Sequence, residues 1–190
     1  MKTFLTWCAT LVFTLNAHAQ VAQPITARDI KIEKITPSVT TSPQYNVSNT
    51  TDKRATYLKW LEIEVEFSID RVELVDELTF EYLVEVGGRL CPGEITHVNI
   101  AKGNSHYSVM YISPRSLDRL TQGKPLSNAM IGNMWITVKK QGQTLASKSV
   151  SPGAPKNLPQ FPGLLIPKSE TPFAPLWFDR YEATRAGTAR

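Results

Sequence analysis

Two stretches of this chain alternate apolar and polar residues with a period of two, and this alternation constrains the fold more than any other feature. From Leu61 to Ile69, the odd positions hold leucine, isoleucine, valine and phenylalanine, and the even positions hold glutamate and serine. From Leu78 to Val86, large apolar residues again occupy every second position. Such alternation is typical of antiparallel strands with one buried and one exposed face. The sequence therefore predicts a sheet protein.

Further strands are expected along the chain, separated by polar or glycine-containing turns. A turn at Asp70–Glu77 would separate the two alternating strands, and Gly87–Gly88 would end the second one. Two more turns are expected at residues 102–104 and at Gln141–Gly142. Seven short strands at this spacing predict an all-β sandwich. The five additional strands are expected at residues 29–35, 95–100, 106–112, 134–140 and 144–150.

One short helix is predicted after residue 112. Ser113 can cap it, Pro114 suits the first helical position, and Gly123 follows its end. Leu117 and Leu120 would lie on one face, so the helix should pack against the end of the sandwich.

The first 19 residues have the pattern of a secretory signal peptide. Lys2 precedes an apolar run from Phe4 to Leu15, and Ala17-His18-Ala19 forms a small-residue cleavage site. The apolar run is too short for a membrane-spanning helix, and no later stretch is long enough. We expect an exported protein, periplasmic or associated with the outer envelope, that begins at Gln20 and has no transmembrane segment.

The remaining 171 residues suit a single domain. Residues 20–57 would supply an N-terminal strand and a polar loop, with residues 36–57 forming the loop or a loosely attached edge. Residues 58–150 would form the sandwich core, and residues 151–190 a proline-rich and aromatic tail. Cys91 would be the only thiol after cleavage, so the fold must rest on its apolar core, with Cys91 expected as a small buried side chain.

The formal net charge of +4 is unevenly distributed. Residues 58–95 hold ten acidic and three basic side chains, whereas residues 96–190 hold twelve basic and four acidic ones. Pairing of acidic with basic segments across the sheet explains this asymmetry, and steering of a charged partner is the alternative. Basic residues do not alternate with aromatic ones as in a nucleic-acid groove, so no nucleic-acid partner is expected.

The tail carries the candidate contact residues. Aromatic side chains are costly to leave in water, so they should be buried either against the chain's own sandwich or against a partner. Self-packing would place Phe173, Trp177 and Phe178 in a groove on the same molecule, whereas the alternative makes this groove part of a partner. The candidate partner contacts are Phe173, Trp177, Phe178 and Tyr181.

The residue patterns predict no catalytic, cofactor-binding or metal site. His97 and His106 would lie too far apart on a hairpin to share an ion, and Ser105-His106 is an ordinary neighbour pair. Glu62, Glu64 and Glu66 share one strand face at a spacing that glycosidases also use, but a solvated acidic face has the same pattern. Exposed aromatic side chains could stack on sugar rings; the candidates are Trp60, Tyr107, Tyr111, Trp135 and Trp177.

Two stretches, ITHVNIAKGNSHYSVMYISPRSLDRL (residues 95–120) and KSETPFAPLWFDRYE (residues 168–182), resemble a known family. It consists of small exported verrucomicrobial proteins with an immunoglobulin-like fold that are associated with type IV pilus-like assembly components. The similarity spans most of residues 58–182. It implies an accessory protein of a pilus or secretion machine in the periplasm or outer envelope, without a cofactor. The long apolar N-terminal stalk of a pilin is not seen, which favours an accessory role over a pilin subunit.

Two functional hypotheses follow. The first is a non-enzymatic interaction protein with envelope or pilus-assembly proteins as partners, a homo-oligomer being a further option. The second is a secreted glycan-binding β-sandwich module. Fold alone does not decide between them, because immunoglobulin-like sandwiches host many unrelated functions.

Overall fold

The computed structural model describes residues 25–45 and 58–185, and this part of the chain forms an antiparallel β-sandwich with one α-helix. The strands run in the order β5-β4-β2-β3-β6, and β1 pairs with the first part of β2. Two single-turn 3₁₀ helices, η1 and η2, precede β4 and follow β6. The elements are β1 (Ile30–Thr41), β2 (Lys59–Val86), β3 (Arg89–Ile112), α1 (Pro114–Thr121), η1 (Asn128–Met130), β4 (Ile131–Lys140), β5 (Gln143–Ser149), β6 (Leu165–Pro167) and η2 (Lys168–Glu170).

The alternating pattern identifies the buried faces correctly. All five apolar side chains of each alternating stretch are buried, and the intervening glutamates are partly exposed. The same alternation continues in β4. These residues form one core between the two layers, together with side chains from β1, β5 and α1. Cys91 lies in this core, as predicted, and burial raises the pKa of its thiol to about 11.

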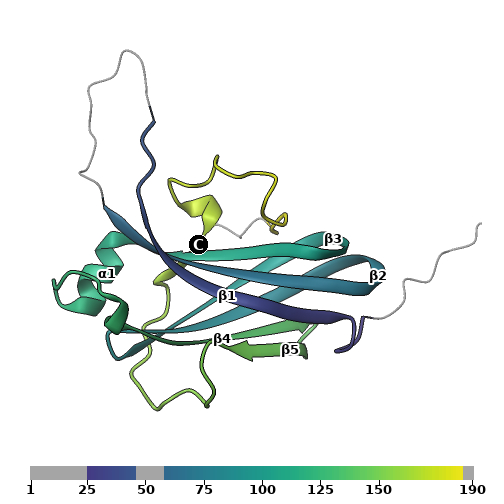
Figure 1. Cartoon of the computed structure of the whole chain (residues 1–190), viewed down its shortest axis with the longest axis horizontal. Helices are drawn as coiled ribbons and strands as arrows, with labels where there is room; N and C mark the ends of the chain where they lie inside the picture. The colour runs from purple at the N-terminus through teal and green to yellow at the C-terminus, as the bar shows by residue number, and fades with distance from the viewer. Residues whose placement is uncertain (1–24, 46–57, 186–190) are drawn as a thin grey trace, which may run out of the picture.

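The two layers are made by two long strands that fold over on themselves. β2 and β3 pair along nearly their whole lengths, and the pairing is interrupted only near Ile69 and Leu74. His97 and Ser108 both belong to β3, and eleven residues of straight strand would separate them by about 36 Å. Their side chains are nevertheless hydrogen-bonded at 2.7 Å. Figure 1 shows β2 and β3 curling at the end of the molecule opposite α1.

This architecture confirms the all-β sandwich but corrects its strand count and two of its turns. The described residues contain six strands, because the expected turns at Asp70–Glu77 and at residues 102–104 are bends inside β2 and β3. A register shift lets a strand bend sharply without leaving the sheet. The hairpin that was expected to carry His97 and His106 is therefore wrong as a strand pairing, because His97 pairs with Leu78 and His106 with Phe67, both of β2.

The true hairpins have the expected glycine turns. Gly87 and Gly88 join β2 to β3, and Gln141 and Gly142 join β4 to β5, all with positive φ. Two-residue turns of this kind match the twist of the strands that they connect.

Residues 36–41 correct a second prediction, because they extend β1 instead of beginning a loop. β1 pairs with β2 as far as Thr41, which lies opposite Lys59. The rest of the expected loop falls largely outside the described residues, as does the predicted signal peptide at residues 1–19.

The helix agrees with its prediction. The Ser113 side chain accepts a hydrogen bond from the Ser116 backbone N–H, Pro114 occupies the first turn, and Leu117 and Leu120 are buried. None of the helices in residues 25–45 and 58–185 is long and apolar enough to cross a membrane.

Candidate functional site

The C-terminal tail, defined as residues 151–185 of the described chain, runs along the outer edge of β3. It meets the first part of β3 at Leu90, whose N–H donates to the Pro159 carbonyl at 2.9 Å. β6 then pairs with residues 110–112 at the other end of β3. The tail finally returns to the first part, where the Val98 N–H donates to the Ala183 carbonyl at 2.9 Å. Because β3 contributes to both layers, the tail links the edges of both (Figure 1).

The middle of the tail packs on the sandwich through an aromatic stack. The ring of Phe173 lies parallel to that of Tyr111, with 4.9 Å between centroids, and meets Trp60 edge-on at 5.6 Å. The ring of Trp177 is also nearly parallel to that of Phe173, with 6.4 Å between centroids. The Tyr45 hydroxyl donates to the Pro172 carbonyl at 2.5 Å. Phe173 is only 1% exposed, so the tail is anchored in its own domain.

A second anchor binds the tail to the acidic face of β2. Arg180 donates to the Glu64 carboxylate from Nε at 2.9 Å and from Nη2 at 2.7 Å, and the Tyr181 hydroxyl donates to the same group at 2.9 Å. The Arg180 guanidinium also lies over the Tyr107 ring, 3.9 Å from its centroid. The hydrogen bonds from Arg180 lower the pKa of Glu64, so this ion pair persists into the acid range.

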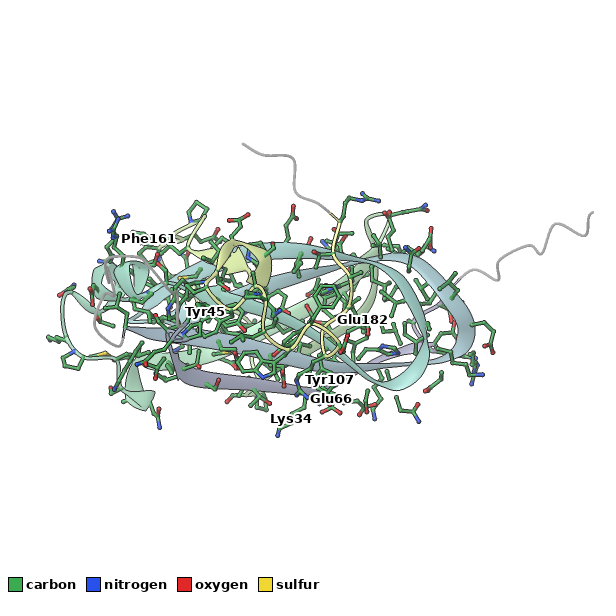
Figure 2. The ribbon with its side chains drawn as sticks, turned by 90° about the horizontal axis from the view of Figure 1, so that it is seen from above. Lys34, Tyr45, Glu66, Tyr107, Phe161 and Glu182 are labelled. Atoms are coloured by element: carbon green, nitrogen blue, oxygen red, sulfur yellow. The ribbon has the colours of Figure 1, made fainter. Side chains whose placement is uncertain are left out.

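Glu182 brings together His97 and His106. Its carbonyl accepts from His97 Nδ1 at 3.2 Å, and its carboxylate lies 2.6 Å from His106 Nδ1. Its own N–H donates to the Tyr107 carbonyl at 3.3 Å. Figure 2 shows Glu182 on the tail beside Tyr107, which belongs to β3.

A buried chain of hydrogen bonds lies behind Glu182. The Glu182 carbonyl can only accept, so His97 Nδ1 carries the proton. His97 Nε2 then accepts from Ser108 Oγ at 2.7 Å, and Ser108 Oγ accepts from the Tyr82 hydroxyl at 2.6 Å. Burial is the main reason that the pKa of His97 falls to about 4, so the ring is neutral at physiological pH.

The Ser108–His97 pair has the spacing of a nucleophile and its base, but its surroundings give it a structural role. Ser108 is fully buried, and its hydroxyl is already bonded to Tyr82. The group beyond His97 is a backbone carbonyl, whereas a catalytic triad has a carboxylate there. The arrangement holds the tail against β3. Within the described residues, no group of three metal-ligating side chains is present.

The structure places the four candidate contact residues in different environments. Phe173 is buried within the chain's own core, so it is not accessible to a partner. Tyr181 is partly buried and bonded to Glu64. Trp177 is 50% exposed and Phe178 is 82% exposed, so self-packing is confirmed for Phe173 and wrong for Phe178.

Among the other sequence candidates, Trp60 and Tyr111 are buried beneath the tail. The acidic segment pairs with basic ones, as predicted. Besides Glu64–Arg180, Lys139 of β4 lies 2.6 Å from Glu81 of β2, and the tail's Arg185 pairs with Glu77. The glutamates on β2 are therefore not a bare solvated face.

Sequence reasoning missed the roles of Arg180 and Glu182. Both directly flank Tyr181, which was a candidate, but the partners of their side-chain hydrogen bonds lie 76 or more residues away. Only the folded-over β3 brings Tyr107, His106 and His97 to one place, and no local sequence signal encodes that fold.

These contacts make the tail part of the domain. The similarity to known proteins extends over the sandwich and the tail. A protein-family model matches the chain from residue 21 to residue 188. The chain belongs to that family. The family match thus includes the sandwich and the tail together.

A solved structure has the same fold. The crystal structure of a protein from Akkermansia muciniphila, a member of the Verrucomicrobia, superimposes with a TM-score of 0.74. The aligned region covers 84% of this chain and 94% of that protein, and the two sequences are 22% identical over it. At this identity the likeness establishes the fold alone. No curated protein matches the chain.

Proposed function

We propose that this protein is a non-enzymatic, exported accessory component of a type IV pilus-like or secretion assembly, and that it acts through protein contacts. The supporting observation is an exposed aromatic pair, Trp177 and Phe178, on a tail that is otherwise fastened to its own domain. Exposed aromatic side chains on an ordered surface are typical of protein interfaces.

The backbone at Trp177 supports a binding role. Its φ is +49°, a left-handed conformation that costs a bulky residue about 1–2 kcal/mol. Such strain persists where the surrounding structure enforces it, and it clusters at binding sites. Here the fixed neighbours on either side are Phe173, buried in the aromatic stack, and Arg180, bonded to Glu64. The strained residue and its exposed neighbour are thereby presented on a rigid support.

The resemblance of residues 95–120 and 168–182 to exported pilus-associated proteins supplies the cellular setting of this proposal. An exported address agrees with the signal-peptide pattern of residues 1–19. A contact function agrees with the structural roles of His97 and Ser108, which a hydrolase would need as accessible groups.

A photo-crosslinking experiment in the native cell envelope tests the proposal. A photoreactive phenylalanine analogue replaces Phe178, and attached chains are identified by mass spectrometry. Leu74 is the matched control, since it is also apolar and is 57% exposed at the bend of β2. We expect pilus-like or secretion components at Phe178 and few or none at Leu74. Equal labelling at both positions, or links to no such component, contradicts the proposal.

Glycan binding is the second candidate, and the exposed face of Trp177 favours it. An indole ring held by stacking on Phe173 can serve as a platform for a sugar ring. Saturable sugar binding that is lost in Trp177→Ala, without partner crosslinks at Phe178, would move this function to first place.

A further inference from the structure

A pocket of about 300 Å³ lies between the tail and β3. One side is formed by Ile95 and Val109 of β3, and the other by Pro167, Ala174 and Phe178 of the tail. This volume is at the lower end of the range for small-molecule sites. The lining is mainly apolar, so the pocket favours an apolar group of modest size.

One cation lies on the pocket wall, and among the described residues it has no carboxylate partner. Lys168 Nζ donates to the Ala174 carbonyl at 2.9 Å and lies 5.5 Å from the centroid of the Tyr181 ring. An ammonium group has three donor protons, so this hydrogen bond leaves donor capacity. Burial lowers the pKa of Lys168, and no nearby charge offsets that effect.

The other ionisable side chains of the wall are already engaged. Glu182 is the single acidic residue in the lining, and its carboxylate is held by His106 at 2.6 Å. The Tyr181 hydroxyl is bonded to Glu64, and both ring nitrogens of His97 are bonded. Lys168 is therefore the charged group that remains for a ligand.

We propose that this pocket binds an apolar carboxylate. The hydrocarbon part of the ligand would contact Ile95, Val109 and Phe178, and its carboxylate would accept a charge-assisted hydrogen bond from Lys168. A partly desolvated ammonium without a counter-ion gains most from an anion, whereas a purely apolar ligand would leave it unpaired. Two sources present this chemistry: a free organic acid, and the C-terminal residue of a polypeptide with an apolar side chain. The proposal does not rest on the proposed assembly function.

Matched probes test the charge requirement on the purified protein. 3-Phenylpropionate and 3-phenylpropanamide have the same shape and differ in charge. A short peptide ending in phenylalanine is compared with its C-terminally amidated form. By isothermal titration calorimetry we expect at least one acid to bind about tenfold more tightly than its amide, as charge-assisted hydrogen bonds are roughly twice as strong as neutral ones. Preferential binding of 3-phenylpropionate would identify a free organic acid as the ligand class, and preferential binding of the peptide acid would identify a polypeptide C-terminus.

Variants of Lys168 separate the site from adventitious binding. Lys168→Met should remove the preference for the acid, and Lys168→Arg should retain it. Because Lys168 also holds the Ala174 carbonyl, each variant's melting temperature is measured, and the acid-to-amide ratio is compared only between folded proteins. Ala174→Leu, which fills the pocket and keeps the charge, should weaken both probes. Equal binding of acid and amide, an unchanged preference in folded Lys168→Met, or no saturable binding of either acid at millimolar concentration overturns the proposal.

Discussion

At the scale of single residues, His97 is the most consequential polar side chain in the core. It connects Tyr82 and Ser108 to the Glu182 carbonyl through a continuous run of hydrogen bonds. Its ring also meets Phe80 edge-on, with 5.4 Å between centroids. A neutral ring satisfies every partner, whereas a protonated ring would be a charge enclosed by apolar side chains.

Stability should therefore depend on the protonation of His97. The pKa is about 4 in the folded protein and about 6.5 in the unfolded chain, so between these values only the unfolded chain binds the proton. The contribution of neutral His97 to the unfolding free energy is complete above pH 6.5 and is lost as the pH falls towards 4. The expected loss is about 3 kcal/mol of unfolding free energy, measured by urea denaturation at pH 7 and pH 4.

A His97→Gln variant is the control for this pH dependence. Glutamine can still donate to one partner and accept from the other, but it does not titrate. All carboxylates contribute equally in both proteins, so the pH effect in the variant should be smaller by about 3 kcal/mol. An identical pH effect in both proteins would show that His97 is not the responsible group.

Phe173 and Phe178 lie five positions apart in the tail and should respond very differently to truncation. Phe173→Ala removes the centre of the aromatic stack and should cost about 3–5 kcal/mol of unfolding free energy. Phe178→Ala should change it by no more than about 0.5 kcal/mol, because that side chain is almost fully in water. Chemical denaturation of both variants checks this, and equal destabilisation would contradict the described path of the tail.

The sequence could identify buried residues only where a period exists. Alternation marks Leu61 and Phe80 as buried without any knowledge of the fold. The tail has no period, because its prolines and short turns change direction every few residues. Composition shows that the tail's aromatic side chains would be unfavourable in water. It does not show that Phe173 is buried and Phe178 is exposed.

At the scale of elements, β6 shows how the tail enters the sandwich. Leu165 pairs with Ile112 of β3, and its buried side chain packs closely against Gly93 of the same strand. A Cβ added at Gly93 would lie only 2.6 Å from the Leu165 Cβ. Glycine at position 93 therefore provides the space that Leu165 occupies.

A double-mutant cycle tests this fit. Gly93→Ala should destabilise the protein by about 1–3 kcal/mol, the usual cost of overpacking. Leu165→Ala should destabilise it through the lost contact. The double variant should be less destabilised than the sum of the two, because the added methyl group fills part of the vacated space. Strict additivity in thermal or urea unfolding would show that the two residues do not compete for volume.

Elements were predictable where local chemistry specifies them. The cap at Ser113, the proline after it and two leucines three positions apart give α1 without tertiary information. The bends of β2 and β3 were mistaken for turns, because polar residues at 70–77 and a glycine at 103 signal a change of direction but not whether pairing stops. Pairing resumes at Leu74, opposite Ala101, so the strands continue through the bend.

At the scale of the whole molecule, the tail should open as one unit. The tail residues that contact Leu90 and Val98 are Pro159 and Ala183, which lie 24 residues apart in sequence but cover one edge of β3. We expect the amide hydrogens of Leu90 and Val98 to exchange at similar rates, and faster than amides between β2 and β4. Phe173→Ala should accelerate both together. Hydrogen exchange measured by NMR checks this, and independent rates at the two sites would show separate local openings.

The covered edge of β3 also has a consequence for the time at which the fold is completed. A chain is synthesised from its N-terminus, so β3 exists before the segment at Pro159–Phe161 that first hydrogen-bonds to its edge. Throughout that interval the strand presents unpaired backbone groups to any neighbouring extended chain. The period of greatest vulnerability to mispairing thus lies late in biogenesis, when most of the sandwich is already made and only its final segment is missing.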